Sequence, residues 1–101
     1  MVMPSFPLSV SEAVQLFKAL GDARRLRLLL LLAEHGPMHV AALCAAVGQS
    51  QTAVSNQLRV LRMTGLVRSR RQGHLAIYSL ASEHARHFLR FVQAGRQPRG
   101  H

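Results

Sequence analysis

The chain has 101 residues, the length of a single domain, because a second hydrophobic core would need roughly another 50 to 100 residues. Its 13 lysines and arginines against 4 aspartates and glutamates give a formal net charge of +9, which indicates a polyanionic partner. With four acids, one cysteine and no phosphate-binding glycine loop, the sequence contains no catalytic set, so it argues against an enzyme and predicts no cofactor.

The most apolar stretch of the chain, 28–33, is bracketed by Arg27 and Glu34 and is far shorter than the ~20 residues that a membrane span needs. The amino-terminal residues show no secretory signal. Cys44 has no partner for a disulfide within its own chain, which agrees with a reducing compartment. We therefore expect a cytoplasmic protein with no membrane partner.

The first ordered element is expected after a flexible lead-in, 1–8. Ser9 and Glu12 have the spacing of a capping box, and apolar residues then recur at helical intervals. This pattern predicts a helix over about 10–20, which Gly21 ends.

Three further helices are predicted in the middle of the chain. Asp22 is a suitable N-cap for a helix over about 23–35, an apolar helix follows over 40–47, and Ser50 is the N-cap of another that runs to about Thr64. The last two are joined by a glycine-containing turn and share an apolar seam of Ala42, Leu43, Val47, Val54, Leu58 and Leu61. Two short helices of this kind are typical of a helix-turn-helix, and the second would be the recognition helix.

Two short strands, 66–71 and 75–80, then surround a glycine turn, which predicts a basic β-hairpin, or wing. A last helix is expected over about 82–94, and 95–101 form a basic tail. The elements together predict a mainly α fold with a small β-hairpin, namely a winged helix-turn-helix of five helices and a two-stranded wing over residues 9–94.

The recognition helix is polar wherever the apolar seam leaves it uncovered. Glutamine side chains recognise adenine edges, arginines recognise guanine, and hydroxyls at a helix start hold phosphate. The alternative is a solvated surface helix, but such a face normally includes acidic residues and 49–80 contain none. The predicted DNA contacts are Ser50, Gln51, Thr52, Ser55, Asn56, Gln57, Arg59 and Arg62.

The wing adds Arg68, Arg70, Arg71 and His74 to the predicted DNA surface. Charges on an edge strand also discourage aggregation, and either sign serves that purpose. Three arginines within four residues beside a glycine turn favour contact with phosphates or the minor groove.

Several segments together resemble the ArsR/SmtB family of repressors over about residues 10–94. They are Phe17-Lys18-Ala19-Leu20-Gly21-Asp22 with Arg25-Leu26, Leu43 to Gly48, Ser50 to Leu61, Gly65-Leu66-Val67 and Ile77-Tyr78-Ser79-Leu80. The resemblance implies a homodimer that packs through its first and last helices and places two recognition helices on an inverted repeat. It also implies that an inducer weakens DNA binding. Gln57 stands where the family commonly has histidine.

The family's metal ligands are mostly missing. His39 and Ala41 occupy the positions of the arsenic-type Cys-x-Cys pair. The zinc-type positions are Ser82, His84, Gly95 and Pro98, of which only His84 matches. Since a metal site needs three or four ligands, we expect none; an unorthodox site that includes His84 and His87 is the alternative.

Cys44 lies where the thiol-sensing BigR, SqrR and HlyU types within this family have their proximal cysteine, which makes this branch the nearest. The second cysteine of that branch is absent, so only modification of Cys44 alone would serve a thiol sensor. The alternative is a buried cysteine that acts as a small apolar residue.

The sequence thus predicts a transcriptional regulator, a repressor acting as a dimer on an inverted repeat, with or without an inducer. Two alternatives remain open: a non-specific architectural DNA-binding protein, favoured by the charge, and a metal-responsive repressor with an unorthodox histidine site. A repressor should prefer one inverted repeat over bulk DNA by at least ~10³, whereas an architectural protein should not.

Overall fold

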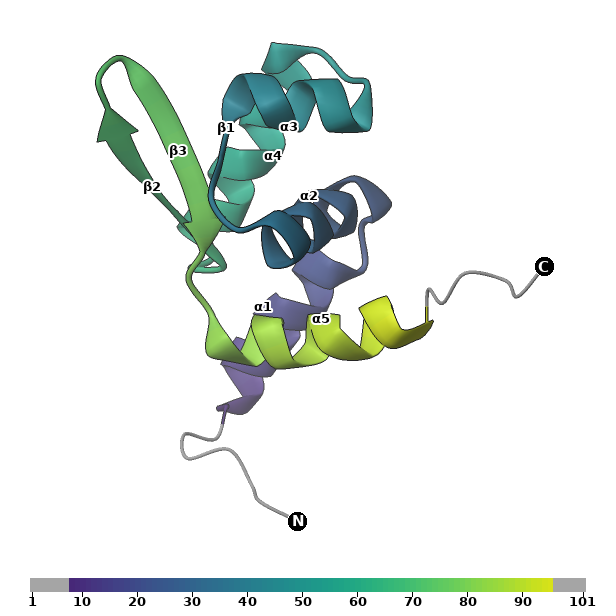
Figure 1. Ribbon diagram of the computed structural model, residues 1–101. Coiled ribbons are helices and arrows are strands. Elements are labelled where there is room, and N and C mark those ends of the chain that lie inside the picture. Colours follow the sequence, from purple (N-terminus) through teal and green to yellow (C-terminus); the bar gives the residue numbers. More distant parts are fainter. Residues whose placement is uncertain (1–7, 96–101) are drawn as a thin grey trace, which may run out of the picture.

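The computed structural model describes residues 8–95, so all but the first residue of the expected basic tail and all but the last residue of the expected lead-in lie outside the described residues. The elements are α1 (Val10–Leu20), α2 (Ala23–His35), β1 (Met38–His39), α3 (Val40–Val47), α4 (Gln51–Met63), β2 (Val67–Gln72), β3 (Leu75–Leu80) and α5 (Glu83–Gly95). The β-hairpin and the turn between α3 and α4 lie at one end of the molecule, and α1 and α5 lie at the other (Figure 1). The predicted fold of five helices with a small β-hairpin wing is confirmed.

Short polar side chains fix where the helices begin. The Ser9 hydroxyl accepts the Glu12 N–H while the Glu12 carboxylate accepts the Ser9 N–H, the reciprocal pair of a capping box. Asp22 accepts two backbone N–H groups at the start of α2, and Ser50 accepts the Ala53 N–H at 3.1 Å at the start of α4. Each cap satisfies donors that the helix itself leaves unpaired.

A strand that the sequence did not predict completes the sheet. The strand order is β1-β3-β2, and β1 pairs antiparallel with β3, with Met38 opposite Tyr78 and His39 opposite Ile77. Two residues are too few to show an apolar alternation, so no sequence pattern marks them. The consequence is that the wing is paired with His39, the N-cap of α3.

The core consists of leucines drawn from most of the helices. The largest fully buried side chains are Leu28, Leu29, Leu32, Leu43, Val54, Leu58, Leu61 and Leu89. Leu43 of α3 packs with Val54, Leu58 and Leu61 of α4 in the predicted seam, whereas Ala42 and Val47 at its border are half-buried. Each fully buried leucine contributes about 1.5 to 3 kcal/mol of transfer free energy, so this seam holds α3 and α4 together.

Large apolar side chains are exposed on α1 and α5. Val10, Phe17 and Phe91 are 82%, 58% and 77% exposed, and Val14 and Phe88 are also exposed. The Phe17 and Phe88 rings meet edge to face with centroids 6.0 Å apart, which joins the two helices' apolar residues into one surface. We call these five residues the α1/α5 apolar face. Among residues 8–95, no helix is both long and apolar enough to cross a membrane.

Candidate nucleic-acid interface

The face of α4 turned away from the core is mainly polar, although Val60 and Met63 are exposed on the same helix. Its seam residues point inward, and the Ser50 cap fixes the first turn. The exposed side chains that remain on α4 include the hydrogen-bonding residues Gln51, Thr52, Ser55, Asn56, Arg59 and Arg62. A helix with this face can donate to and accept from base edges in a major groove.

Gln57 differs from the other predicted contacts on α4. Its side chain is half-buried, and its Oε1 atom is buried without a hydrogen-bond partner among residues 8–95. The reason is its position beside Leu58 and three residues after Val54, at the border of the buried seam. The carboxamide oxygen therefore faces protein, unlike that of an outward base contact.

The wing presents its arginines on two different faces. Arg68, Arg70, Arg71 and His74 are all exposed. Arg68 and Arg70 lie opposite Ser79 and Ile77 of β3, and Arg71 lies opposite Ala76. Because side chains alternate along a strand, Arg68 and Arg70 share one face and Arg71 lies on the other.

A side-chain hydrogen bond joins the recognition helix to the wing. The Arg62 guanidinium donates from Nη1 to the Ser69 hydroxyl at 3.4 Å, from the last turn of α4 to β2. Sequence reasoning assigned Arg62 to DNA and did not find this contact, because residues seven apart on different elements carry no spacing signal. The bond helps to orient α4 and the wing relative to each other.

The acidic residues of the described chain lie away from this surface. Glu12, Asp22, Glu34 and Glu83 belong to α1, α2 and α5 or cap them. Asp22 pairs with two arginines, at 3.3 Å from Arg24 and 3.6 Å from Arg25. The polar face of α4 and the wing therefore form a positive surface, as binding to a phosphate backbone requires.

The candidate metal ligands named from the sequence do not form a cluster in the structure. Among residues 8–95, no group of three or more histidine, cysteine, aspartate or glutamate side chains could hold a metal ion. His84 is half-buried and His87 is exposed on α5. His39 serves instead as the N-cap of α3, where its Nδ1 accepts the Ala42 N–H at 3.4 Å.

The Cys44 thiol is half-buried on α3 and packs against the leucine core. This location suits a small apolar residue. Whether it also senses thiol-reactive species stays a prediction of the sequence.

Comparison with known proteins agrees with this architecture. Residues 22–69 match the family described as bacterial regulatory protein, arsR family. The arsenical resistance operon repressor of Escherichia coli (strain K12) is 46% identical over 68 residues, which are 67% of this chain. The chain spans 58% of that repressor's length, which is less than two thirds.

Two solved structures resemble the whole described fold. HlyU from Vibrio cholerae N16961 has a TM-score of 0.81 and 30% identity, over 85% of this chain and 92% of HlyU. The homodimeric winged helix-turn-helix domain of Mb0332 from Mycobacterium bovis, a possible ArsR-family regulator, has a TM-score of 0.76 and 32% identity, over 91% and 90% of the two chains. The resemblance predicted from the sequence is confirmed, and the chain belongs to the ArsR family of bacterial regulatory proteins, which are winged helix-turn-helix transcriptional regulators and not enzymes.

Proposed function

We propose that the protein is a sequence-specific repressor that binds an inverted repeat in duplex DNA as a homodimer in the cytoplasm. The observation that carries this proposal is the exposed polar face of α4, which lies beside an arginine-rich wing without an acidic residue between 49 and 80. A surface that only needed to be soluble would mix both signs of charge.

The two parts of this surface have different roles in the proposal. Gln51 near the start of α4 presents a carboxamide suited to the N6 and N7 atoms of adenine, and Arg59 suits the O6 and N7 atoms of guanine. Thr52 donates to a phosphate at the helix start, and Arg68 and Arg70 hold phosphates through the wing. Specificity thus comes from α4, while the wing supplies affinity for any duplex.

We further propose that the dimer forms through the α1/α5 apolar face. Five large apolar side chains gathered on one surface are unusual for a monomer and mark a protein interface. A second copy of the same chain is the occupant, because a two-fold axis through this face pairs it with itself. Such a dimer would present its two α4 helices to half-sites about one helical turn of DNA apart, or a multiple of that distance.

The test is DNA-binding anisotropy of the full chain with a labelled fragment from upstream of its own gene. We expect unlabelled bulk DNA to compete at least ~10³ times less well than the unlabelled fragment. Gln51→Ala should reduce this preference and leave the affinity for bulk DNA nearly unchanged, while Gln15→Ala on the exposed side of α1 should change neither. Equal competition by both DNAs would identify an architectural protein instead, and an unaltered preference in Gln51→Ala would remove Gln51 from the interface.

A further inference from the structure

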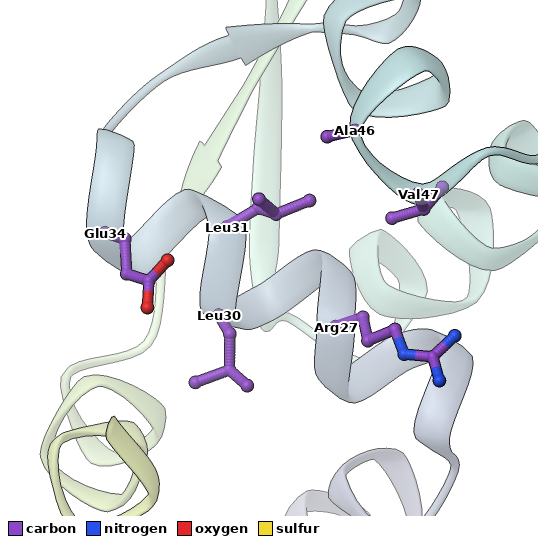
Figure 2. A pocket seen from close by; sticks show the side chains of 6 residues that line it. All are labelled: Arg27, Leu30, Leu31, Glu34, Ala46 and Val47. Atoms are coloured by element: carbon purple, nitrogen blue, oxygen red, sulfur yellow. The ribbon is translucent and has the colours of Figure 1, made fainter. Parts of the chain in front are cut away.

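A pocket of about 500 Å³ lies between α2 and α3, outside the surfaces assigned so far. Figure 2 shows the side chains that line it, namely Arg27, Leu30, Leu31 and Glu34 from α2 and Ala46 and Val47 from α3. The volume falls within the range of about 300 to 1,000 Å³ that is common for small-molecule sites. No lining residue belongs to α1, α5 or α4, so neither the proposed dimer nor the proposed DNA contact needs to cover it.

The lining is apolar in the middle and charged at its two ends. The leucines, Ala46 and Val47 form the apolar part, and Figure 2 shows Arg27 and Glu34 on opposite sides of Leu30 and Leu31. These two charged residues are seven positions apart on one helix, which corresponds to roughly 10 Å along the axis. The Arg27 side chain is exposed and forms no ion pair within residues 8–95, so its guanidinium is available to an anion.

We propose that this pocket binds a small organic monocarboxylate with an apolar body. The carboxylate accepts two parallel hydrogen bonds from the Arg27 guanidinium, a geometry that a planar guanidinium favours. The apolar body lies against Leu31 and Val47 and loses its contact with water there. A second carboxylate would lie against the apolar part of the lining, where the described residues offer no second cation, so the site discriminates against dicarboxylates.

The pocket is also placed to affect DNA binding, a consequence that rests on the proposed function. Val47 is the last residue of α3 and precedes Gly48, whose φ of 69° forms the turn toward α4. A ligand between α2 and α3 therefore contacts the helix that leads into the recognition helix. It changes DNA affinity to the extent that it prefers one arrangement of α2 and α3 over another.

Binding is tested without DNA, by amide NMR titration of the full chain with sodium octanoate. We expect saturable shifts that centre on α2 residues 27–34 and on Ala46 and Val47. Octanol, which lacks the charge, and octanedioate, which carries a second carboxylate, should each bind at least about tenfold more weakly.

Arg27→Gln should weaken octanoate binding about tenfold or more, since it removes a charge-assisted contact and keeps most of the stem. Arg24→Gln changes an exposed arginine one turn earlier on α2, which pairs with Asp22 and lies outside the lining; it is the control and should bind octanoate normally.

Three results would overturn the proposal: shifts that do not saturate, shifts centred on the α1/α5 apolar face, or equal affinities for wild type and Arg27→Gln. The anisotropy assay with saturating octanoate forms a separate arm. A changed DNA affinity in wild type but not in Arg27→Gln supports a regulatory pocket, and an unchanged affinity refutes regulation by this site. Because the titration contains no DNA, failure to bind octanoate leaves the proposed repressor function intact.

Discussion

The Ser50 side chain has one structural role that is independent of DNA. Its oxygen accepts the Ala53 N–H at 3.1 Å and so satisfies a donor at the start of α4. Replacement by alanine removes that acceptor, so Ser50→Ala should lower the free energy of unfolding by about 1 kcal/mol. Urea denaturation measures this difference.

Ser55→Ala is the matched control for this prediction, because it makes the same chemical change on the same helix at an exposed position that caps nothing. It should leave stability unchanged or raise it slightly through helix propensity. A loss in Ser55→Ala equal to that in Ser50→Ala would show that capping is not the cause.

Single residues differ in how well sequence determines their role. The caps Ser9, Asp22 and Ser50 could be predicted because an N-cap acts on N–H groups two or three positions further along the chain. The orientation of Gln57 and the Arg62 contact with Ser69 could not, because they depend on how α4 is rotated against the core and the wing.

At the scale of helices, acidity should weaken the start of α2. The Arg24 guanidinium and the backbone N–H groups of Arg24 and Arg25 lower the pKa of Asp22 from its usual 3.8. A lowered folded-state pKa means that ionised Asp22 stabilises the fold above about pH 3.8, and that this stability is lost as pH falls through the folded-state value. The same reasoning applies to Glu12, whose pKa is lowered by the Ser9 N–H.

Asp22→Asn should therefore make the stability of the fold depend less on pH in the acidic range. Asparagine still caps the helix but has no charge to lose, so the variant's urea midpoint should fall less than that of wild type from about pH 5 to about pH 2. An equal fall of the urea midpoint in the two proteins would contradict the role given to the Asp22 charge.

The wing should contribute affinity for duplex DNA of any sequence. Arg70→Ala removes one exposed cation from β2, so the slope of log affinity against log salt should decrease by about one and all duplexes should bind more weakly. Anisotropy at several salt concentrations measures the slope. Arg86→Ala on α5, which removes the same charge from outside α4 and the wing, should leave the slope unchanged. If the two variants have equal slopes, the wing does not contact phosphate.

The elements themselves could mostly be predicted from the sequence. The bounds of α1, α2 and α3 match their caps and glycines, and α4 and α5 differ from expectation by a residue at their ends. β1 was missed because Met38 and His39 become a strand only through pairing with β3. A local pattern contains no information on such a partner.

At the scale of the whole molecule, the α1/α5 apolar face should control assembly. Phe91→Glu places a charge where the proposed partner would bury it, so the dimer should weaken by at least about 2 kcal/mol, roughly thirtyfold. Sedimentation equilibrium measures the change, and affinity for an inverted repeat should fall with it.

Met63→Glu is the control for assembly, since Met63 is as exposed, at 79%, but lies on α4. Its dimer constant should equal that of wild type. Dimerisation that survives in Phe91→Glu and fails in Met63→Glu would move the interface to α4.

The apolar pattern of α1 shows where sequence reasoning about the whole molecule ends. Val10, Val14 and Phe17 recur at the helical interval that usually marks a core face, yet they are exposed in the single chain. The spacing predicts that this face of α1 will be buried, but it does not show whether the same chain or a second copy buries it. The fold could therefore be predicted in outline, whereas the assembly required the resemblance.

The two-residue pairing of β1 with β3 gives the hairpin a mechanical property. β1 pairs with Tyr78 and Ile77 in the middle of β3, so the hairpin turn at Gly73 lies about four residues, roughly 13 Å, beyond the pairing of His39 with Ile77. A tilt of about 5° about this pairing would displace the turn by roughly 1 Å over that length, which is enough to break a hydrogen bond of ordinary length. Since His39 is also the N-cap of α3, this pairing couples a shift of α3 to the wing, and the largest displacement falls on the residues beyond the pairing, including Arg71 and His74.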